Sequence, residues 1–277
     1  MKLPPLVAQM GPHEKDIRGH FKGKTTFKGK SPEFAGPLVL VGFFNRTGST
    51  LLANHLRGLD HVSGFKEYLN SGMVLKRAER YELRSFPDYF RHGETRSKAP
   101  GHIHGYKAGW NQIQMLLRCG IDRMYEDGIR VVHISRRDVV AQAVSLLIAR
   151  QTAQWTSEHA GRDGVEPEYD ADQLSHLIQT CYDAENRIKI LSQMCDLPYH
   201  PVVYEDLVDN PQAVMAGVGT FLGRDLSAWE PAEVAIKRQA STRNADWKAR
   251  YLAEAREALS QPMRRGRGKG GPKAAAE

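Results

Sequence analysis

Short apolar runs alternate with segments of helical spacing along the middle of the chain. The run "LVLVGFF" follows the turn-rich stretch "SPEFAGP", and "TLLANHLRGL" after it has its apolar residues at helical spacing. The same order returns in "IRVVHIS" and "DVVAQAVSLLIARQTAQW", where Val140, Val144, Leu147 and Ile148 form one stripe. It returns in "LPYHPVVYEDL" before "NPQAVMAGVGTFLG", a helix with proline in its first turn and glycine at its end. Strands that alternate with helices predict an α/β fold, a central parallel sheet with helices on both faces.

Between these units, "ADQLSHLIQTCYDAENRIKILSQM" predicts one long amphipathic helix, and "TSEHAGRDGVEPEYD" before it predicts a flexible loop. A chain of 277 residues with 41% apolar content can bury one substantial core. The net charge of +7 is concentrated in the glycine-rich stretches "HFKGKTTFKGK" and "RRGRGKGGPK" near the two ends. We therefore predict a basic flexible arm over residues 1–35, one domain over 36–260, and a disordered basic tail over 261–277.

The sequence shows no pattern typical of a membrane span, a secretory signal, a disulfide framework or a cysteine metal site. No apolar run approaches the about 20 residues of a membrane-spanning helix, and the N-terminus lacks the pattern of a secretory signal, so we expect a cytoplasmic protein. Cys119, Cys181 and Cys195 fit neither a disulfide framework nor a CxxC metal site, and we expect buried reduced thiols.

The stretch "VGFFNRTGSTLLANHL" is the first candidate for chemistry. A glycine-rich turn between a strand and a helix directs backbone N–H groups and the positive helix end at one point, which suits a phosphate or sulfate. A nucleoside triphosphate loop reads G-x-x-x-x-G-K-[ST]. Here five residues separate Gly42 from Gly48, Ser49 takes the place of the lysine, and the positive charge moves to Arg46. The alternative is an ordinary strand-to-helix turn.

A second candidate lies where the strand "RVVHIS" ends at Arg136 and Arg137. A magnesium-dependent triphosphatase usually has a metal-binding Asp at the end of a strand, whereas a site that neutralises its anion with arginines needs no metal. Ser145 follows Arg137 by eight positions, about two helical turns, so the two side chains could hold another anion. The alternative is a surface arginine and a small packing serine.

Together, these motifs resemble the sulfotransferases that use 3′-phosphoadenosine 5′-phosphosulfate (PAPS). The chain is most similar to the bacterial trehalose 2-sulfotransferase-like carbohydrate sulfotransferases, which carry R-S-G-S-T-L-L and R-R-D…Q-A-V-S-L motifs where this chain has "RTGSTLL" and "RRDVVAQAVSLLIARQTAQW". Three further stretches, "GYKAGWNQ", "VVYEDLVDNPQA" and "RQASTRNADWKARY", look like that family in the same order, over roughly residues 38 to 252. The resemblance implies the P-loop-like sulfotransferase fold.

The resemblance also implies roles for particular residues. The first loop would hold the 5′-phosphosulfate, with Arg46 facing the leaving phosphate, through Arg46, Thr47, Gly48, Ser49 and Thr50. Arg137 and Ser145 would hold the 3′-phosphate, and Arg238 and Gln239 would close over the nucleotide.

The family's catalytic base lies in a G-x-P-x-E-Y-F segment, which here reads "GFKEYL", so Glu67 is the matching residue. The proline is absent and the spacing is one residue short, and the alternative is that Glu67 begins a helix or pairs with Lys66. Lys107, at the end of a predicted strand near the family's pocket, is a further catalytic candidate, with a solvated charge as the alternative.

The implied reaction moves a sulfuryl group from PAPS to a carbohydrate hydroxyl, of a trehalose-like sugar, a glycolipid or lipopolysaccharide, and releases 3′,5′-adenosine bisphosphate (PAP) without metal. A homodimer and peripheral contact with an anionic membrane at its inner face are further expectations, and nucleic acid is not expected as a partner. Two alternatives stay open: a P-loop nucleotide-dependent kinase, disfavoured by the missing loop lysine and metal aspartate, and a basic nucleic-acid-binding protein.

Other candidates are weaker. His102 and His104 lack a third ligand at suitable spacing for a metal. We expect Glu205 and Asp206 to cap the helix that follows them. Trp110 and Trp155 could stack on a sugar or adenine, or form core or pocket wall.

Overall fold

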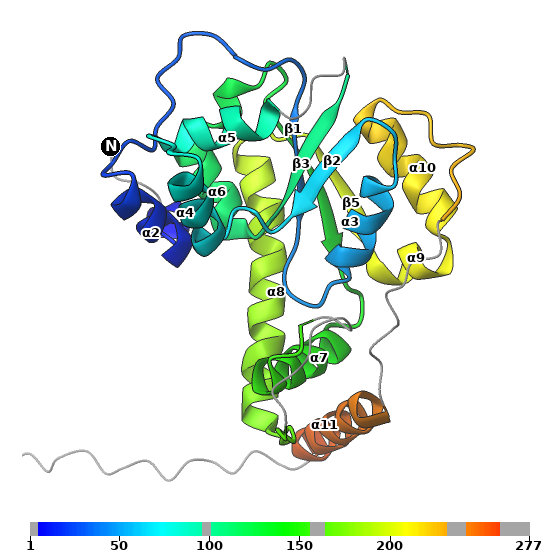
Figure 1. The fold of residues 1–277 in the computed structure, drawn as a ribbon. Coiled ribbons are helices and arrows are strands. Elements are labelled where there is room, and N and C mark those ends of the chain that lie inside the picture. Colours follow the sequence, from blue (N-terminus) through cyan, green and yellow to red (C-terminus); the bar gives the residue numbers. More distant parts are fainter. Residues whose placement is uncertain (1–4, 96–100, 156–163, 232–241, 261–277) are drawn as a thin grey trace, which may run out of the picture. The chain divides into compact units, whose positions relative to one another are not determined.

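Five parallel strands form one sheet in the order β2-β3-β1-β4-β5 (Figure 1). The computed structural model describes residues 5–95, 101–155, 164–231 and 242–260. The strands are β1 (Leu38–Gly42), β2 (Val62–Lys66), β3 (Ile103–Ala108), β4 (Ile129–Ser135) and β5 (Tyr199–Val203). The predicted α/β fold with a central parallel sheet is confirmed.

Helices connect the strands and cover both faces of the sheet (Figure 1). The described helices of the whole chain are α1 (Pro5–Ala8), α2 (Pro12–His20), α3 (Ser49–Arg57), α4 (Ser71–Arg80), α5 (Phe86–Glu94), α6 (Trp110–Arg118), the 3-10 turn η1 (Asp122–Met124), α7 (Val139–Thr152), α8 (Ala171–Met194), α9 (Tyr204–Asp209), α10 (Pro211–Leu222) and, in a separate unit, α11 (Thr242–Ser260). The long helix predicted from residue 171 onward is confirmed as α8. The predicted loop before it falls partly outside the described residues, at 156–163.

The two faces of the sheet follow from the alternation of side chains along β1. Leu38 and Leu40 belong to one buried cluster and Val39 and Val41 to the other, because successive residues of a strand point to opposite faces. A strand buried on both faces reads as a continuous apolar run, which is why "LVLV" has no polar positions. Helices α2, α4, α5 and α6 contribute to the first cluster, and α3 and α10 contribute to the second.

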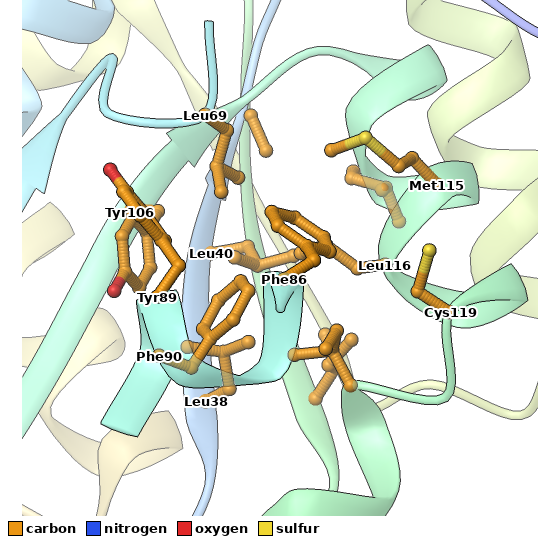
Figure 2. Packing of buried hydrophobic residues seen from close by; sticks show 14 of the residues in the cluster. Leu38, Leu40, Leu69, Phe86, Tyr89, Phe90, Tyr106, Met115, Leu116 and Cys119 are labelled. Carbon is orange, nitrogen blue, oxygen red and sulfur yellow. The ribbon is translucent and has the colours of Figure 1, made fainter. Parts of the chain in front are cut away.

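Aromatic side chains fill much of the first cluster. Figure 2 shows Phe86, Tyr89 and Phe90 of α5 gathered near Tyr106 of β3 and Leu40 of β1. The Phe90 and Tyr106 ring centroids lie 5.5 Å apart at a tilt, a favourable arrangement for an aromatic pair. This packing anchors the central strands that carry the site.

The predicted signals at the ends of α10 are also present. Asn210 accepts a hydrogen bond from the Ala213 N–H at 3.1 Å, Pro211 opens the helix, and Gly223 ends it in the left-handed conformation with φ 69°. Of the cysteines, Cys119 and Cys181 are buried as expected, but Cys195 is exposed, so the expectation was wrong for that residue. Among the helices of the described residues, none has the length and apolar content needed to cross a membrane.

The N-terminal segment differs from the predicted flexible arm over residues 1–35. Ile17, Phe21 and Phe27 are at most 4% exposed and lie in the first cluster. Glu14 is buried too, and its carboxylate accepts from Arg18 and Arg118 at 2.9 and 2.7 Å. The glycines and lysines of residues 15–30 occupy exposed positions, and their number concealed the few apolar residues that insert into the core.

The chain divides into two compact units, Met1–Gln239 and Ala240–Glu277. The described part of the second unit is α11, which carries an Arg250–Glu254 ion pair at 2.8 Å one turn apart. Whether the predicted 36–260 domain extends through this helix stays a prediction, and the predicted tail over 261–277 lies outside the described residues.

We expect Ile17→Ala to lower the free energy of unfolding by about 2–5 kcal/mol, because it leaves a cavity in the first cluster. Lys15→Ala, at an exposed position of the same helix, should change it by less than about 0.5 kcal/mol. Urea unfolding measures both. Equal free energies of unfolding for the two variants would instead support the predicted flexible arm.

Candidate active site

The loop between β1 and α3 leads directly into the first turn of a helix. The first N–H groups of a helix have no acceptor within it, and they form its positive end, so this position suits an anion. Thr47 is buried, and its hydroxyl donates to the Phe44 carbonyl at 2.8 Å, which closes the loop upon itself. Arg46 and Gly48 both have left-handed backbones, with φ 67° and 81°.

Gly48 is required for packing as well as for its backbone. A Cβ atom at this position would lie 2.2 Å from Cδ2 of Tyr204, the first residue of α9. Because no real Cβ tolerates that distance, the Tyr204 ring can pack against the loop only if residue 48 is glycine. The "VVYEDL" stretch thus supports the loop from about 150 residues further along the chain.

Arg46 and Ser145 are brought together, a pairing that the sequence did not predict. The Arg46 Nε donates to the Ser145 Oγ at 2.8 Å, and a terminal nitrogen donates to the Trp155 carbonyl. Burial, and then the neighbouring charge of Arg136, lower the pKa of the Arg46 guanidinium. The loop is therefore tied to α7 and to the segment after it.

Lys107 and Glu67 meet beside this loop. Lys107 lies opposite Val41 in the β1–β3 register and is 5% exposed. Its Nζ donates to the Glu67 Oε1 at 2.9 Å and to the Thr50 Oγ1 at 3.3 Å, and it lies 4.6 Å from the centroid of the Phe43 ring. Burial lowers the pKa of Lys107 from its ordinary 10.5, while Glu67 acts in the opposite direction.

These contacts decide between the alternatives for the two residues. Lys107 is not a solvated charge, and Glu67 pairs with Lys107 and not with Lys66. Glu67 also precedes the first residue of α4, Ser71, so it does not begin that helix. The structure brings together three predicted site residues, Glu67, Lys107 and Thr50, from separate segments.

A bulge in β2 precedes Glu67. The register with β3 shifts between Gly64 and Lys66, and Phe65 has a left-handed backbone with φ 50° although its ring is fully buried. Gly64 approaches β3 so closely that a Cβ would lie 2.2 Å from the Gly105 carbonyl oxygen. A bulge redirects the residues that follow it, and here those residues carry the carboxylate.

Arg137 and Ser145 are not brought together by side-chain contacts. Arg137 is exposed, and one terminal nitrogen donates to both oxygens of Asp206 at 2.8 and 3.0 Å. The neighbouring Arg136 faces the loop: it donates to the Arg46 carbonyl at 3.4 Å, and its guanidinium lies 5.0 Å from the Tyr204 ring centroid. From the sequence, Arg137 was selected by its spacing from Ser145. The contact of Arg136 with the loop between β1 and α3 was not predicted.

Two further polar residues near the loop were missed or misassigned. The buried Gln142 donates to the Asn45 carbonyl at 2.9 Å, and the carboxylate of Glu205 accepts from the backbone N–H groups of Arg137 and Asp138 at 2.9 and 3.2 Å. Glu205, like Asp206, was expected to cap the helix that follows it, but Asn210 caps that helix, α10, so the expectation was wrong. Glu205 holds the turn after β4 instead.

The remaining candidates divide clearly. His102 and His104 both hydrogen-bond to the Ser63 hydroxyl, at 2.8 and 2.9 Å, and in the described part of the chain no three His, Cys, Asp or Glu side chains gather as a metal site. The ring of Trp110 lies under Arg187 at 4.5 Å, and Trp155 is 42% exposed. The predicted nucleotide-closing residues, Arg238 and Gln239, fall outside the described residues, and the role of each site residue stays a prediction.

Residues 39–254 match the model of the Stf0 sulphotransferase family. The chain belongs to this family.

Two curated relatives are named trehalose 2-sulfotransferase. One, from Mycobacterium tuberculosis, is 30% identical over 178 residues, which are 59% of this chain and 66% of that protein. The other, from Mycolicibacterium smegmatis, is 29% identical over 176 residues, 58% of this chain and 65% of that protein. The match thus spans slightly less than two thirds of the length of these relatives.

Among solved structures, the sulfotransferase domain of the Synechococcus PCC 7002 olefin synthase is similar in fold. It superposes with a TM-score of 0.52 at 14% identity, covering 86% of this chain and 98% of that domain. The P-loop-like sulfotransferase fold is thereby confirmed.

We expect Lys107→Met to raise the free energy of unfolding at neutral pH by about 1 kcal/mol, because it removes a desolvated charge. The folded-state pKa of Lys107 is below 10.5, so the cost of its charge is full at low pH and disappears as pH rises to 10.5. The increase in the free energy of unfolding caused by Lys107→Met should therefore become smaller as pH rises toward 10.5.

Urea unfolding at pH 7 and near pH 10 measures this change. Lys66→Met, at an exposed lysine one residue before Glu67, is the matched control and should show neither the gain nor its pH dependence. A Lys107→Met variant less stable than the wild type at neutral pH would contradict the account.

Proposed function

We propose that the protein transfers a sulfuryl group from PAPS to a hydroxyl of a carbohydrate acceptor, by in-line displacement without metal. The observation that carries the proposal is the contact of Lys107 with both Glu67 and the loop residue Thr50. It couples a carboxylate that can accept a proton to a loop suited to an anion. Membership of the Stf0 family, and relatives named for sulfation of trehalose, support the same reaction.

The residues of the loop fit an anionic donor. The first turn of α3 offers backbone N–H groups, and Arg46 and Arg136 supply two positive charges beside them. The Nε of Arg136 is buried without a hydrogen-bond partner in the described residues, and its ion pair with the Glu205 Oε1 spans 3.7 Å, so it can still donate to a ligand oxygen.

The donor contacts in the proposal include the residues predicted from the sequence and add one. The 5′-phosphosulfate lies against Arg46, Thr47, Gly48, Ser49 and Thr50. Arg136 is the addition, beside the same loop. The 3′-phosphate is assigned to Ser145 and Arg137, and Arg238 and Gln239 close over the nucleotide.

In the proposed reaction, the acceptor oxygen forms a bond to sulfur while the bond between sulfur and the 5′-phosphate oxygen breaks. Glu67 takes the proton of the acceptor hydroxyl, and Arg46 and Lys107 balance the charge that develops on the departing phosphate. Lys107 has a second task, because its hydrogen bonds hold the carboxylate of Glu67 at a fixed distance from Thr50.

The acceptor in the proposal is a trehalose-like sugar, or the sugar of a glycolipid or lipopolysaccharide. A glycolipid acceptor would place the enzyme at the anionic inner face of a membrane, where the basic residues near the chain ends would favour binding. A cytoplasmic location and a homodimer belong to the same proposal. The kinase and nucleic-acid alternatives have no comparable support.

We expect PAP to stabilise the protein far more than AMP or ATP does in a thermal-shift experiment without added magnesium. A ligand at a hundred times its dissociation constant adds about 2.7 kcal/mol, so a specific site is easily detected. Arg136→Ala should reduce the shift with PAP, whereas Arg130→Ala, at a half-buried arginine of β4, the strand that ends just before Arg136, should not. Equal shifts with PAP and AMP would rule out the proposed donor.

A further inference from the structure

Asn70 occupies the N-cap position of α4 but does not cap that helix. An Asn at this position usually accepts a hydrogen bond from an N–H of the first turn. Here its Oδ1 accepts from the Gln112 Nε2 at 2.9 Å, and its Nδ2 donates to the Glu67 Oε2 across a long 3.4 Å. The side chain thus bridges α6 and the candidate base.

The direction of this bridge is fixed at its far end. The Gly109 backbone N–H, at the N-cap of α6, donates to the Gln112 Oε1 at 2.9 Å. Because a backbone N–H can only donate, Gln112 must present its oxygen there and its NH₂ group to Asn70. Asn70 must then present its own oxygen to Gln112 and its NH₂ group to Glu67. We name Gly109, Gln112, Asn70 and Glu67 the amide relay.

The amide relay and Lys107 together engage both oxygens of Glu67. Oε1 accepts from Lys107 at 2.9 Å and Oε2 accepts from Asn70 at 3.4 Å. A carboxylate that accepts hydrogen bonds on both oxygens is held in one orientation, as a general base must be. Glu67 is 47% exposed, so packing alone does not fix its side chain.

The backbone around Asn70 is held from two sides. Ser71, the next residue, hydrogen-bonds with its hydroxyl to Asp16 at 2.8 Å, and its N–H donates to the His13 ring at 3.1 Å. The carbonyl of Tyr68 accepts from the Tyr89 hydroxyl at 2.6 Å. Gln112 itself is 5% exposed. The relay therefore runs between two well-anchored elements.

We infer that Asn70 and Gln112 are positioning residues that orient Glu67 toward the acceptor hydroxyl. The inference rests on the proposed function, in which Glu67 is the base. Gln112 touches neither Glu67 nor the loop in the described contacts, so it acts through Asn70.

Kinetics of variants at Gln112 and Asn70 test the consequence. We expect Gln112→Met and Asn70→Ser each to lower kcat at least about tenfold, because a base displaced by a fraction of an ångström loses much of its advantage. The KM for PAPS and the affinity for PAP should stay within about twofold. Because the side chain of Asn70 does not cap α4, and serine is favoured at N-cap positions, Asn70→Ser should not weaken the helix.

Gln114→Met is the matched control. Gln114 is an equally buried glutamine of α6, at 4% exposure, whose amide donates to the carbonyls of Val7 and Gln9. It should keep full kcat. In the double variant of Gln112 and Asn70, kcat should be no lower than in Asn70→Ser alone, since Gln112 acts through Asn70.

A spectroscopic arm makes the test independent of turnover. In ¹⁵N NMR spectra, Glu67→Gln should shift the side-chain amide signals of Asn70 and Gln112 and leave that of Gln114 unchanged. Unchanged Asn70 and Gln112 signals, a Gln112→Met variant with normal kcat, or additive losses in the double variant would overturn the inference. If the wild type transfers no sulfuryl group while the NMR shifts appear, the proposed function fails and the relay stands.

Discussion

The buried ammonium group of Lys107 is the interaction on which the candidate site depends. It joins the end of β3 to the segment after β2 and to the first turn of α3, three parts of the chain that are distant in sequence. Desolvating the charge costs free energy, which the Glu67 carboxylate and the Phe43 ring only partly offset. A group kept at such a cost is typical of a functional site.

The rest of the fold places the partners of this lysine. The strand β1 lies between β3 and β4 (Figure 1). Parallel pairing with β3 brings Lys107 beside the loop that follows β1, and pairing with β4 brings Arg136 to the same edge of the sheet. Ligands of open parallel sheets bind at this edge. The N-terminal segment contributes indirectly, because α2 packs in the first cluster and holds the start of α4, next to Asn70.

The fold class and the local motifs could be predicted from the sequence. The alternating apolar runs and the "RTGSTLL" loop are defined by residues that are neighbours in the chain. Glu67 and Lys107 were identified separately, but their pairing was not, because it depends on the β2 bulge and on strand register. The tyrosine under Gly48, the Arg136 contact with the loop and the amide relay connect positions about 40 to 160 residues apart, and one sequence carries no signal for such contacts. The N-terminal segment was misread because its lysines and glycines outnumber its buried Ile17, Phe21 and Phe27.

The central claim is that Glu67, held by Lys107 beside the loop, accepts the proton of a sugar hydroxyl during sulfuryl transfer. Single-turnover transfer from ³⁵S-labelled PAPS to trehalose and a panel of glycolipid sugars tests it most directly, with Glu67→Gln compared against Glu79→Gln, an exposed glutamate of α4. We expect one labelled sugar per PAP released, a rate at least about 100-fold lower in Glu67→Gln, and an unchanged rate in Glu79→Gln. A Glu67→Gln variant that keeps more than about a tenth of the wild-type rate would contradict it.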